Sequence, residues 1–139
     1  MMDRAKLIAE LEQDEGRRKR IYVDTVGKVS GGVGRNLTDR GFRDDEIDLM
    51  LTNDIDEAIA ELDRRLPWWR TLDDARARAL TNMSLNLGIN RLTGFGKMLS
   101  ALNRGDWETA ASEALNSKWA SQVGKRAERI AEMFRTGSA

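Results

Sequence analysis

One long amphipathic segment does most to constrain the fold of this chain. Five aliphatic residues recur three or four positions apart between Asp44 and Pro67, namely Ile47, Leu51, Ile55, Ile59 and Leu62. This period predicts one helix that begins near Asp44 and ends before the proline. At roughly 22 residues it would be ~33 Å long, enough to bridge two lobes. With 139 residues, 40% of them apolar, the chain can form one compact domain or two small lobes that share a core.

The N-terminal third combines a helix with a hairpin. Asp3 can cap a helix that runs to about Asp14, and Gly16 supplies its stop. From Ile21 to Val33 the sequence is dense in β-branched residues and glycine around a turn, which predicts a small β-hairpin. We expect residues 36–41 to continue as a loop.

The C-terminal part is predicted to be helical throughout. Asp73 or Asp74 can cap a core helix that closes at Gly88. Further helices are expected over residues 96–103, 106–115, 117–122 and 125–135. Four bulky residues are candidates for packing anchors between them: Trp68, Trp69, Trp107 and Trp119. The predicted fold class is therefore mainly α, of the α+β kind, with one small hairpin.

Composition excludes several classes of function. The 23 basic and 23 acidic residues give formal neutrality, which disfavours a strongly basic nucleic-acid binder. Without cysteine there is no disulfide framework, and without histidine there is no histidine-dependent triad and no imidazole metal ligand. No apolar run approaches a membrane span, so we expect neither a signal peptide nor a membrane anchor. The remaining acid–base chemistry belongs to carboxylates.

Two carboxylates and a hydroxyl stand out between the first helix and the hairpin. Glu15 lies at the predicted helix end, Asp24 opens the turn, and Ser30 lies on the returning strand. Cleavage of a glycosidic bond needs one carboxyl that donates a proton and a second that stays ionised opposite it. Glu15 would be the proton donor and Asp24 the second acid, while Ser30 could hold a water molecule.

Each of these features also has an ordinary interpretation. A lone acid at a helix end is usually solvated, and an aspartate that opens a turn is common turn chemistry. The glycines from Gly31 to Gly34 are not followed by Gly-Lys-Ser/Thr, so a close approach of ligand or backbone fits them better than a phosphate cradle. The basic run Arg17 to Arg20 could attract an anionic polymer or could simply be a solvated face.

The order Glu-x8-Asp-x5-Ser, followed by Gly-x-Gly, resembles the phage-type lysozyme family, glycoside hydrolase family 24. Further segments resemble that family in the same order along nearly the whole chain, among them Asp14-Glu15-Gly16, Asn53-Asp54-Ile55-Asp56, Ser117-Lys118-Trp119 and Phe134-Arg135-Thr136-Gly137. The resemblance implies a single lysozyme-like domain over residues 1–139. Its N-terminal lobe would span about residues 14–43 and its bridging helix about 44–66. Its helical C-terminal lobe would comprise residues 67–139 and helix 3–14.

The resemblance also implies an activity. Members hydrolyse the β-1,4 bond between N-acetylmuramic acid and N-acetylglucosamine in peptidoglycan, without metal or organic cofactor. Glu15 falls on the family's proton donor and Asp24 on its second acid. Ser30 takes the place of a usual threonine, whose hydroxyl positions the attacking water in an inverting mechanism.

Other residue roles come from the same resemblance. The positions expected to bind substrate are Gly34, Asn36, Leu85, Asn86 and Met98. Arg126 matches an arginine that pairs with the catalytic glutamate. Arg35 replaces a common histidine and is expected to pair with Asp54, while Gly31 replaces a common isoleucine and could loosen the loop that carries Ser30.

The resemblance finally implies a biological setting. We expect a monomeric endolysin, made in the host cytoplasm and admitted by a holin to peptidoglycan in the periplasm, with the glycan strands as its partner. One alternative is a peptidoglycan-binding protein that kept the fold but lost turnover. A second is a helical nucleic-acid-binding domain, which steep salt dependence would reveal. A third is a lytic transglycosylase, which anhydro-muramyl products would reveal.

Overall fold

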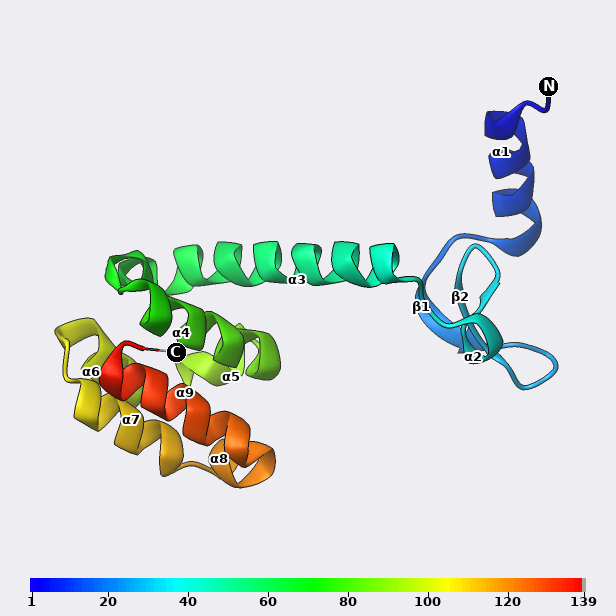
Figure 1. Cartoon of the computed structure of the whole chain (residues 1–139). Coiled ribbons are helices and arrows are strands. Elements are labelled where there is room, and N and C mark those ends of the chain that lie inside the picture. Colours follow the sequence, from blue (N-terminus) through cyan, green and yellow to red (C-terminus); the bar gives the residue numbers. More distant parts are fainter. Residues whose placement is uncertain (139) are drawn as a thin grey trace. The chain divides into compact units, whose positions relative to one another are not determined.

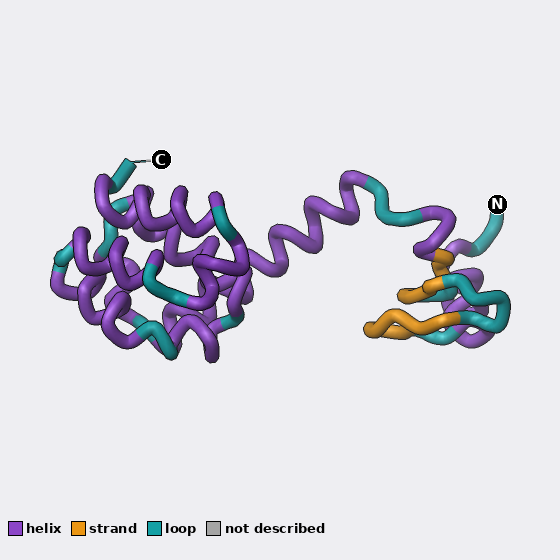
Figure 2. Tube along the Cα trace, turned by 90° about the horizontal axis from the view of Figure 1, so that it is seen from below, coloured by secondary structure: helices purple, strands orange, loops and turns teal. Residues whose placement is uncertain are grey.

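The chain divides into two compact units. The structure, a computed structural model, describes residues 1–138. The first unit is Met1–Leu49 and the second begins at Met50, so the division falls within one long helix. All three strands that the described residues form lie in the first unit (Figure 2). Over residues 1–138, no helix combines the length and apolar character that crossing a membrane would need.

The first helix forms as its capping residues predict. Helix α1 spans Arg4–Glu15, and the Asp3 carboxylate accepts a hydrogen bond from the Lys6 backbone N–H at 3.1 Å. At the other end, the Gly16 backbone N–H donates to the Glu12 carbonyl at 2.9 Å. Glu15 is therefore the last helical residue.

The predicted hairpin is part of a three-stranded antiparallel sheet. Strands β1 (Arg18–Val23), β2 (Val29–Gly32) and β3 (Arg35–Asn36) follow one another in that order across the sheet. The register pairs Val23 with Val29, and an irregularity lies between Arg18 and Tyr22. The central strand is β2, which carries Ser30.

The loop predicted over residues 36–41 is wrong. Residues Leu37–Arg40 form a short helix, α2, that ends at Gly41. The Asn36 side chain caps it by accepting a hydrogen bond from the Asp39 backbone N–H at 3.0 Å. A single helical turn offers too few positions for a period, which is why only its cap could have predicted it.

The long helix is confirmed. Helix α3 spans Asp44–Arg65, with three acidic residues in its first turn and two basic residues in its last, an arrangement that suits the helix dipole. Of its apolar residues, Ala58 and Leu62 are buried in the second unit, whereas Ile47 and Leu51 are exposed.

The second unit is a bundle of short helices (Figure 1). After α3 its elements are the 3₁₀ helix η1 (Pro67–Thr71), α4 (Asp74–Leu87), α5 (Ile89–Thr93), α6 (Gly96–Arg104), α7 (Trp107–Leu115), α8 (Lys118–Val123) and α9 (Lys125–Thr136). The helices predicted for this region are confirmed within a residue or two. The elements η1 and α5 were not predicted.

Small side chains allow the helices of this bundle to pack closely. Helix α7 packs against both α6 and α9, and α4 also packs against α9. Alanines contribute much of the core at these helices: Ala79, Ala101, Ala110, Ala111, Ala114, Ala127 and Ala131. Two of the four expected tryptophan anchors, Trp69 and Trp119, are buried, and the other two are partly buried against the core. The mainly α fold class with a small sheet is therefore confirmed.

Candidate active site

Ser30 lies at the centre of the sheet of the first unit. It pairs with Tyr22 on β1 and with Asn36 on β3. The residue is 4% exposed. Within the first unit its hydroxyl has no hydrogen bond to another protein group, so the hydroxyl is free to bind a water molecule.

Asp24 is fixed by the turn that it opens. One carboxylate oxygen, Oδ1, accepts hydrogen bonds from the backbone N–H groups of Val26 at 3.0 Å and Lys28 at 2.8 Å. The Asp24 backbone N–H also donates to the Lys28 carbonyl at 2.8 Å. These bonds, both to Oδ1, orient the carboxylate.

Glu15 lies against the turn between β2 and β3. Gly34 has φ +65°, and a Cβ built on it would lie 2.6 Å from Oε2 of Glu15. Any side chain at position 34 would therefore displace the Glu15 carboxyl. This close approach is the reason for glycine at this position, as the sequence suggested for the glycine-rich segment.

The first unit thus holds all three predicted catalytic residues. Asp24 follows Val23 directly, and Val23 pairs with Val29, the neighbour of Ser30. Glu15 reaches the same small sheet through Gly34. The helix end and the sheet together bring two carboxyls and a hydroxyl into one compact unit.

Arg35 forms an ion pair with Glu46 in the first turn of α3. Glu46 also accepts a hydrogen bond from the Arg43 backbone N–H at 2.7 Å. The Arg35 hydrogen bond, followed by that of Arg43, lowers the pKa of Glu46 to about 2. Glu46 was not predicted from the sequence, although the third residue of a helix is a common capping position. The expected partner, Asp54, belongs to the second unit, so that pairing stays a prediction.

Asn36, expected to bind substrate, has a structural role in this unit. Its Oδ1 accepts from the Asp39 backbone N–H, and its Nδ2 donates to the Asp39 carboxylate at 2.9 Å. Both ends of the amide are thus engaged in the cap of α2. Its contact with glycan stays a prediction.

The remaining predicted positions lie in the second unit. Asn86 accepts a hydrogen bond from the Trp119 indole N–H at 2.7 Å. Arg126 donates to the Asn82 amide oxygen through Nε at 3.0 Å and Nη2 at 2.9 Å, and its predicted pairing with Glu15 joins two units and stays a prediction.

Leu85 and Met98 differ sharply in accessibility. Leu85 is 39% exposed and available for contact, whereas Met98 is 1% exposed and packs in the core. Direct contact between Met98 and glycan stays a prediction that this burial does not favour.

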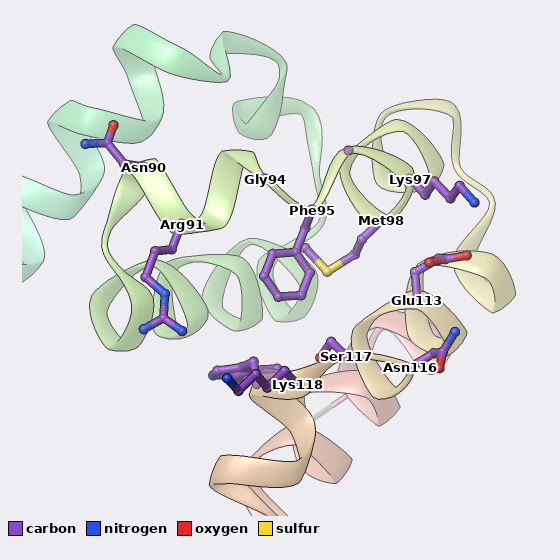
Figure 3. Close-up of a pocket in the computed structure, with 12 residues that line it drawn as sticks. Asn90, Arg91, Gly94, Phe95, Lys97, Met98, Glu113, Asn116, Ser117 and Lys118 are labelled. Carbon is purple, nitrogen blue, oxygen red and sulfur yellow. The ribbon is translucent and has the colours of Figure 1, made fainter.

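A hollow of about 650 Å³ lies within the second unit. Phe95 and Met98 point towards it, with Ser117 and Lys118 on the opposite side (Figure 3). Phe95 meets Trp119 edge to face, with ring centroids 6.4 Å apart. The rim carries three cations, Arg91, Lys97 and Lys118, and one acid, Glu113. An apolar floor with a mainly cationic rim suits a ligand that carries carboxylates.

A metal centre finds no support in the part of the chain that the structure describes. No group of three or more acidic, histidine or cysteine side chains there could hold a metal ion.

Comparisons with known proteins identify a family. The family model described as "Phage lysozyme" matches residues 12–132. The pre-baseplate central spike protein Gp5 of Enterobacteria phage T4 is 28% identical over 156 residues, which cover 92% of this chain and 27% of that protein. Two proteins of Dictyostelium discoideum, probable T4-type lysozymes 2 and 1, are each 26% identical over 157 residues, with 92% of both chains covered.

Proposed function

The chain belongs to the phage lysozyme family, and we propose that it hydrolyses the β-1,4 bond between N-acetylmuramic acid and N-acetylglucosamine in bacterial peptidoglycan. Membership of this family makes the chain a glycoside hydrolase. The observation that carries the proposed site is the contact of the Glu15 carboxyl with Gly34, on the unit that also holds Asp24 and Ser30.

In the proposed reaction Glu15 donates its proton to the oxygen of the leaving sugar. Asp24 stays ionised and stabilises the positive charge that develops on the other sugar. Ser30 holds the water that attacks from the opposite face, which inverts the anomeric configuration. Such a mechanism needs the two carboxyls ~6.5–9.5 Å apart, to leave room for the water.

Further residues are proposed to support this site. Gly34, Asn36, Leu85 and Asn86 would contact the glycan. Leu85 is exposed, and the hydrogen bond from Trp119 fixes the orientation of the Asn86 amide, which supports their part in this proposal. Arg126 would pair with Glu15 in the free enzyme, as the family resemblance implies.

The hollow beside Phe95 is proposed to take the acidic part of the substrate. The stem peptides of peptidoglycan carry carboxylates, and Arg91, Lys97 and Lys118 lie on the rim of the hollow. These local cations offset the formal neutrality of the chain and can attract an anionic polymer.

We further propose that the protein serves in lysis of a bacterial host. It would be made in the host cytoplasm, act as a monomer and reach the periplasmic wall with the help of a holin.

The experiment that tests the activity compares the wild type with Glu15→Gln on outer-membrane-permeabilised Gram-negative cells. We expect the wild type to clear the cells and release reducing ends, and Glu15→Gln to do neither. Glu10→Gln is the matched control, because it removes an exposed acid from the same helix. If no variant releases reducing ends but all bind purified peptidoglycan, the protein is a binding module and the proposal fails.

The stereochemistry is tested separately. Proton NMR of the first products reports which anomer forms before mutarotation. Release of the α-anomer supports inversion, and release of the β-anomer contradicts it.

A further inference from the structure

A second hollow, distinct from the one beside Phe95, carries the opposite charge. It has a volume of about 490 Å³ and lies between α3 and the C-terminal end of α4, within the second unit. Three acidic residues of α3 line it: Asp54, Glu57 and Glu61. Among residues 1–138, no basic side chain lines it. We call this hollow the acidic groove.

The three carboxylates share one face of α3. Their spacings of three and four residues place them in a row along the helix. Glu61 forms an ion pair with Arg64, whereas Glu57 forms no ion pair with any described residue of the second unit. The groove therefore keeps the Glu57 carboxylate available for a cation from outside.

Ser84 supplies an independent observation from the opposite wall. The residue lines the groove, is 4% exposed and makes no side-chain hydrogen bond within the described chain. One turn earlier on α4, the Thr81 hydroxyl donates to the Ala77 carbonyl at 2.8 Å, the usual solution for a hydroxyl within a helix. Ser84 as a residue is almost wholly buried, and its unbonded hydroxyl is available to a ligand in the groove that it lines.

The donor set selects the kind of cation. Among the described residues, no cluster of acidic side chains could hold a metal ion, so these carboxylates are not arranged around one point. A primary ammonium group has three donors that can reach separate acceptors. Leu85 and Ile89 line the same groove and can cover the methylene groups of its stem.

We propose that the acidic groove binds a primary ammonium group of peptidoglycan. Two sources of this group exist in the polymer, namely the side-chain amine of a diamino acid in the stem peptide and the amine of a de-N-acetylated sugar. The inference rests on the proposed function, because it names a feature of the same substrate. Glu57 and Ser84 are its specificity-determining residues.

The test compares peptidoglycan that has free amines with the same material after N-acetylation. For the wild type, acetylation is expected to raise KM about three- to fivefold, the range of one exposed ion pair, with kcat unchanged. Glu57→Gln and Ser84→Ala are expected to raise KM only on the free-amine substrate. On acetylated material both variants should equal the wild type.

Glu128→Gln is the matched control, since it removes one exposed acid from α9, away from the groove. For Glu128→Gln, acetylation of the substrate should raise KM as much as it does for the wild type. If acetylation no longer raises KM for Glu128→Gln, as expected for Glu57→Gln, the net charge of the protein is responsible and the inference is overturned. Circular dichroism of each variant establishes that it is folded, and Glu57→Lys, which should repel the ammonium, gives a second variant at the same position.

Peptide-free glycan distinguishes the two sources of the amine. If partially de-N-acetylated glycan keeps the preference over its re-acetylated form, the groove binds the sugar amine; if the preference requires peptide, it binds the diamino acid. If every free-amine substrate and its N-acetylated form have equal KM values, the inference is overturned and the muramidase proposal stays intact. Absence of reducing ends from every substrate would overturn the muramidase proposal. Co-sedimentation of Glu15→Gln with the two forms of peptidoglycan would then still test amine binding.

Discussion

Gly34 lies so close to Glu15 that a Cβ on the glycine would be 2.6 Å from the Oε2 atom of the glutamate. We expect Gly34→Ala to displace the Glu15 carboxyl and to reduce release of reducing ends at least tenfold. Because φ is +65° there, the free energy of unfolding should also fall by about 1–2 kcal/mol.

Gly32→Ala separates these two effects. Gly32 has a similar φ of +61°, but nothing lies within 4 Å of the position that an added Cβ would take. The variant should lose stability to a similar extent and keep most of its activity. Equal losses of activity in both variants, measured by reducing-end release and urea denaturation, would contradict the role of the Gly34 contact.

Gly31→Ala is expected to stabilise the protein. An added Cβ would lie 3.5 Å from Cδ1 of Leu37 and 3.7 Å from Cγ2 of Ile21, which is ordinary van der Waals contact. The backbone there is not in the positive-φ region, so alanine costs no strain. We expect the free energy of unfolding to rise by about 0.5–1 kcal/mol in urea denaturation. A decrease would show that the central strand has no room at this position.

Ser30→Ala should separate activity from stability. Since the hydroxyl has no hydrogen bond within the described chain and the residue is buried, its removal should change the free energy of unfolding by less than about 0.5 kcal/mol. Loss of water positioning should lower kcat roughly 10–100-fold. Full kcat for Ser30→Ala would remove Ser30 from the mechanism.

The Arg35–Glu46 pair predicts a dependence of stability on pH. The hydrogen bond from Arg35 lowers the pKa of Glu46 from its usual 4.5 to about 2. A carboxyl whose pKa is lower in the folded protein stabilises it fully above pH 4.5, and this contribution is lost as the pH falls towards 2. Melting temperatures measured between about pH 7 and about pH 2 should therefore fall less steeply for Glu46→Gln than for the wild type.

Arg35→Met provides the matching comparison, because it removes the other partner of the pair. Its melting curve should lose the same part of the pH dependence. Asp63→Asn should remove a different contribution to the pH dependence of the melting temperature. Hydrogen bonds from Arg70 and then Trp69 lower the pKa of Asp63 to about 2 within the second unit. If the melting temperature of Glu46→Gln falls with pH as steeply as that of the wild type, the Arg35–Glu46 pair contributes nothing to the pH dependence of stability.

Arg76 joins the start of α4 to the end of α9. Its Nε donates to the Phe134 carbonyl at 2.7 Å and its Nη2 to the Arg135 carbonyl at 3.1 Å, while its guanidinium lies 3.8 Å from the centroid of the Trp107 ring. Arg76→Met should lower the free energy of unfolding by about 3–5 kcal/mol, because buried partners lose their donor.

The neighbouring Arg78 is the control for this variant. It is exposed and pairs with Asp74, so Arg78→Met should change stability by less than about 1 kcal/mol. Similar losses in both variants, measured by urea denaturation, would contradict the special role of Arg76.

Elements that depend on local signals could be predicted from the sequence. The apolar period and Pro67 identified α3, and Asp73 with Gly88 set the limits of α4. Helix α5 was missed because Gly88 both ends α4 and begins the next helix, leaving a segment too short for a period.

Contacts between distant residues could not be predicted in this way. The hydrogen bond from Trp119 to Asn86 joins residues 33 positions apart, and neither side chain signals its partner. The Arg35–Glu46 pair likewise depends on how β3 and the first turn of α3 lie within the first unit. The spacing of Glu15, Asp24 and Ser30 was visible in the sequence, but the contact of Glu15 with Gly34 needed the fold.

Among the residues of the first unit, Ser30 and Gly31 alone are buried, whereas the second unit has a broad apolar core. The catalytic candidates are thus held by backbone hydrogen bonds of a small sheet and by turns, with little packing beneath them. Local opening of such a segment costs little free energy. Amide protons of β1 and β2 should therefore exchange with solvent much faster than those of α7 and α9, and a bound glycan should slow them more than any others.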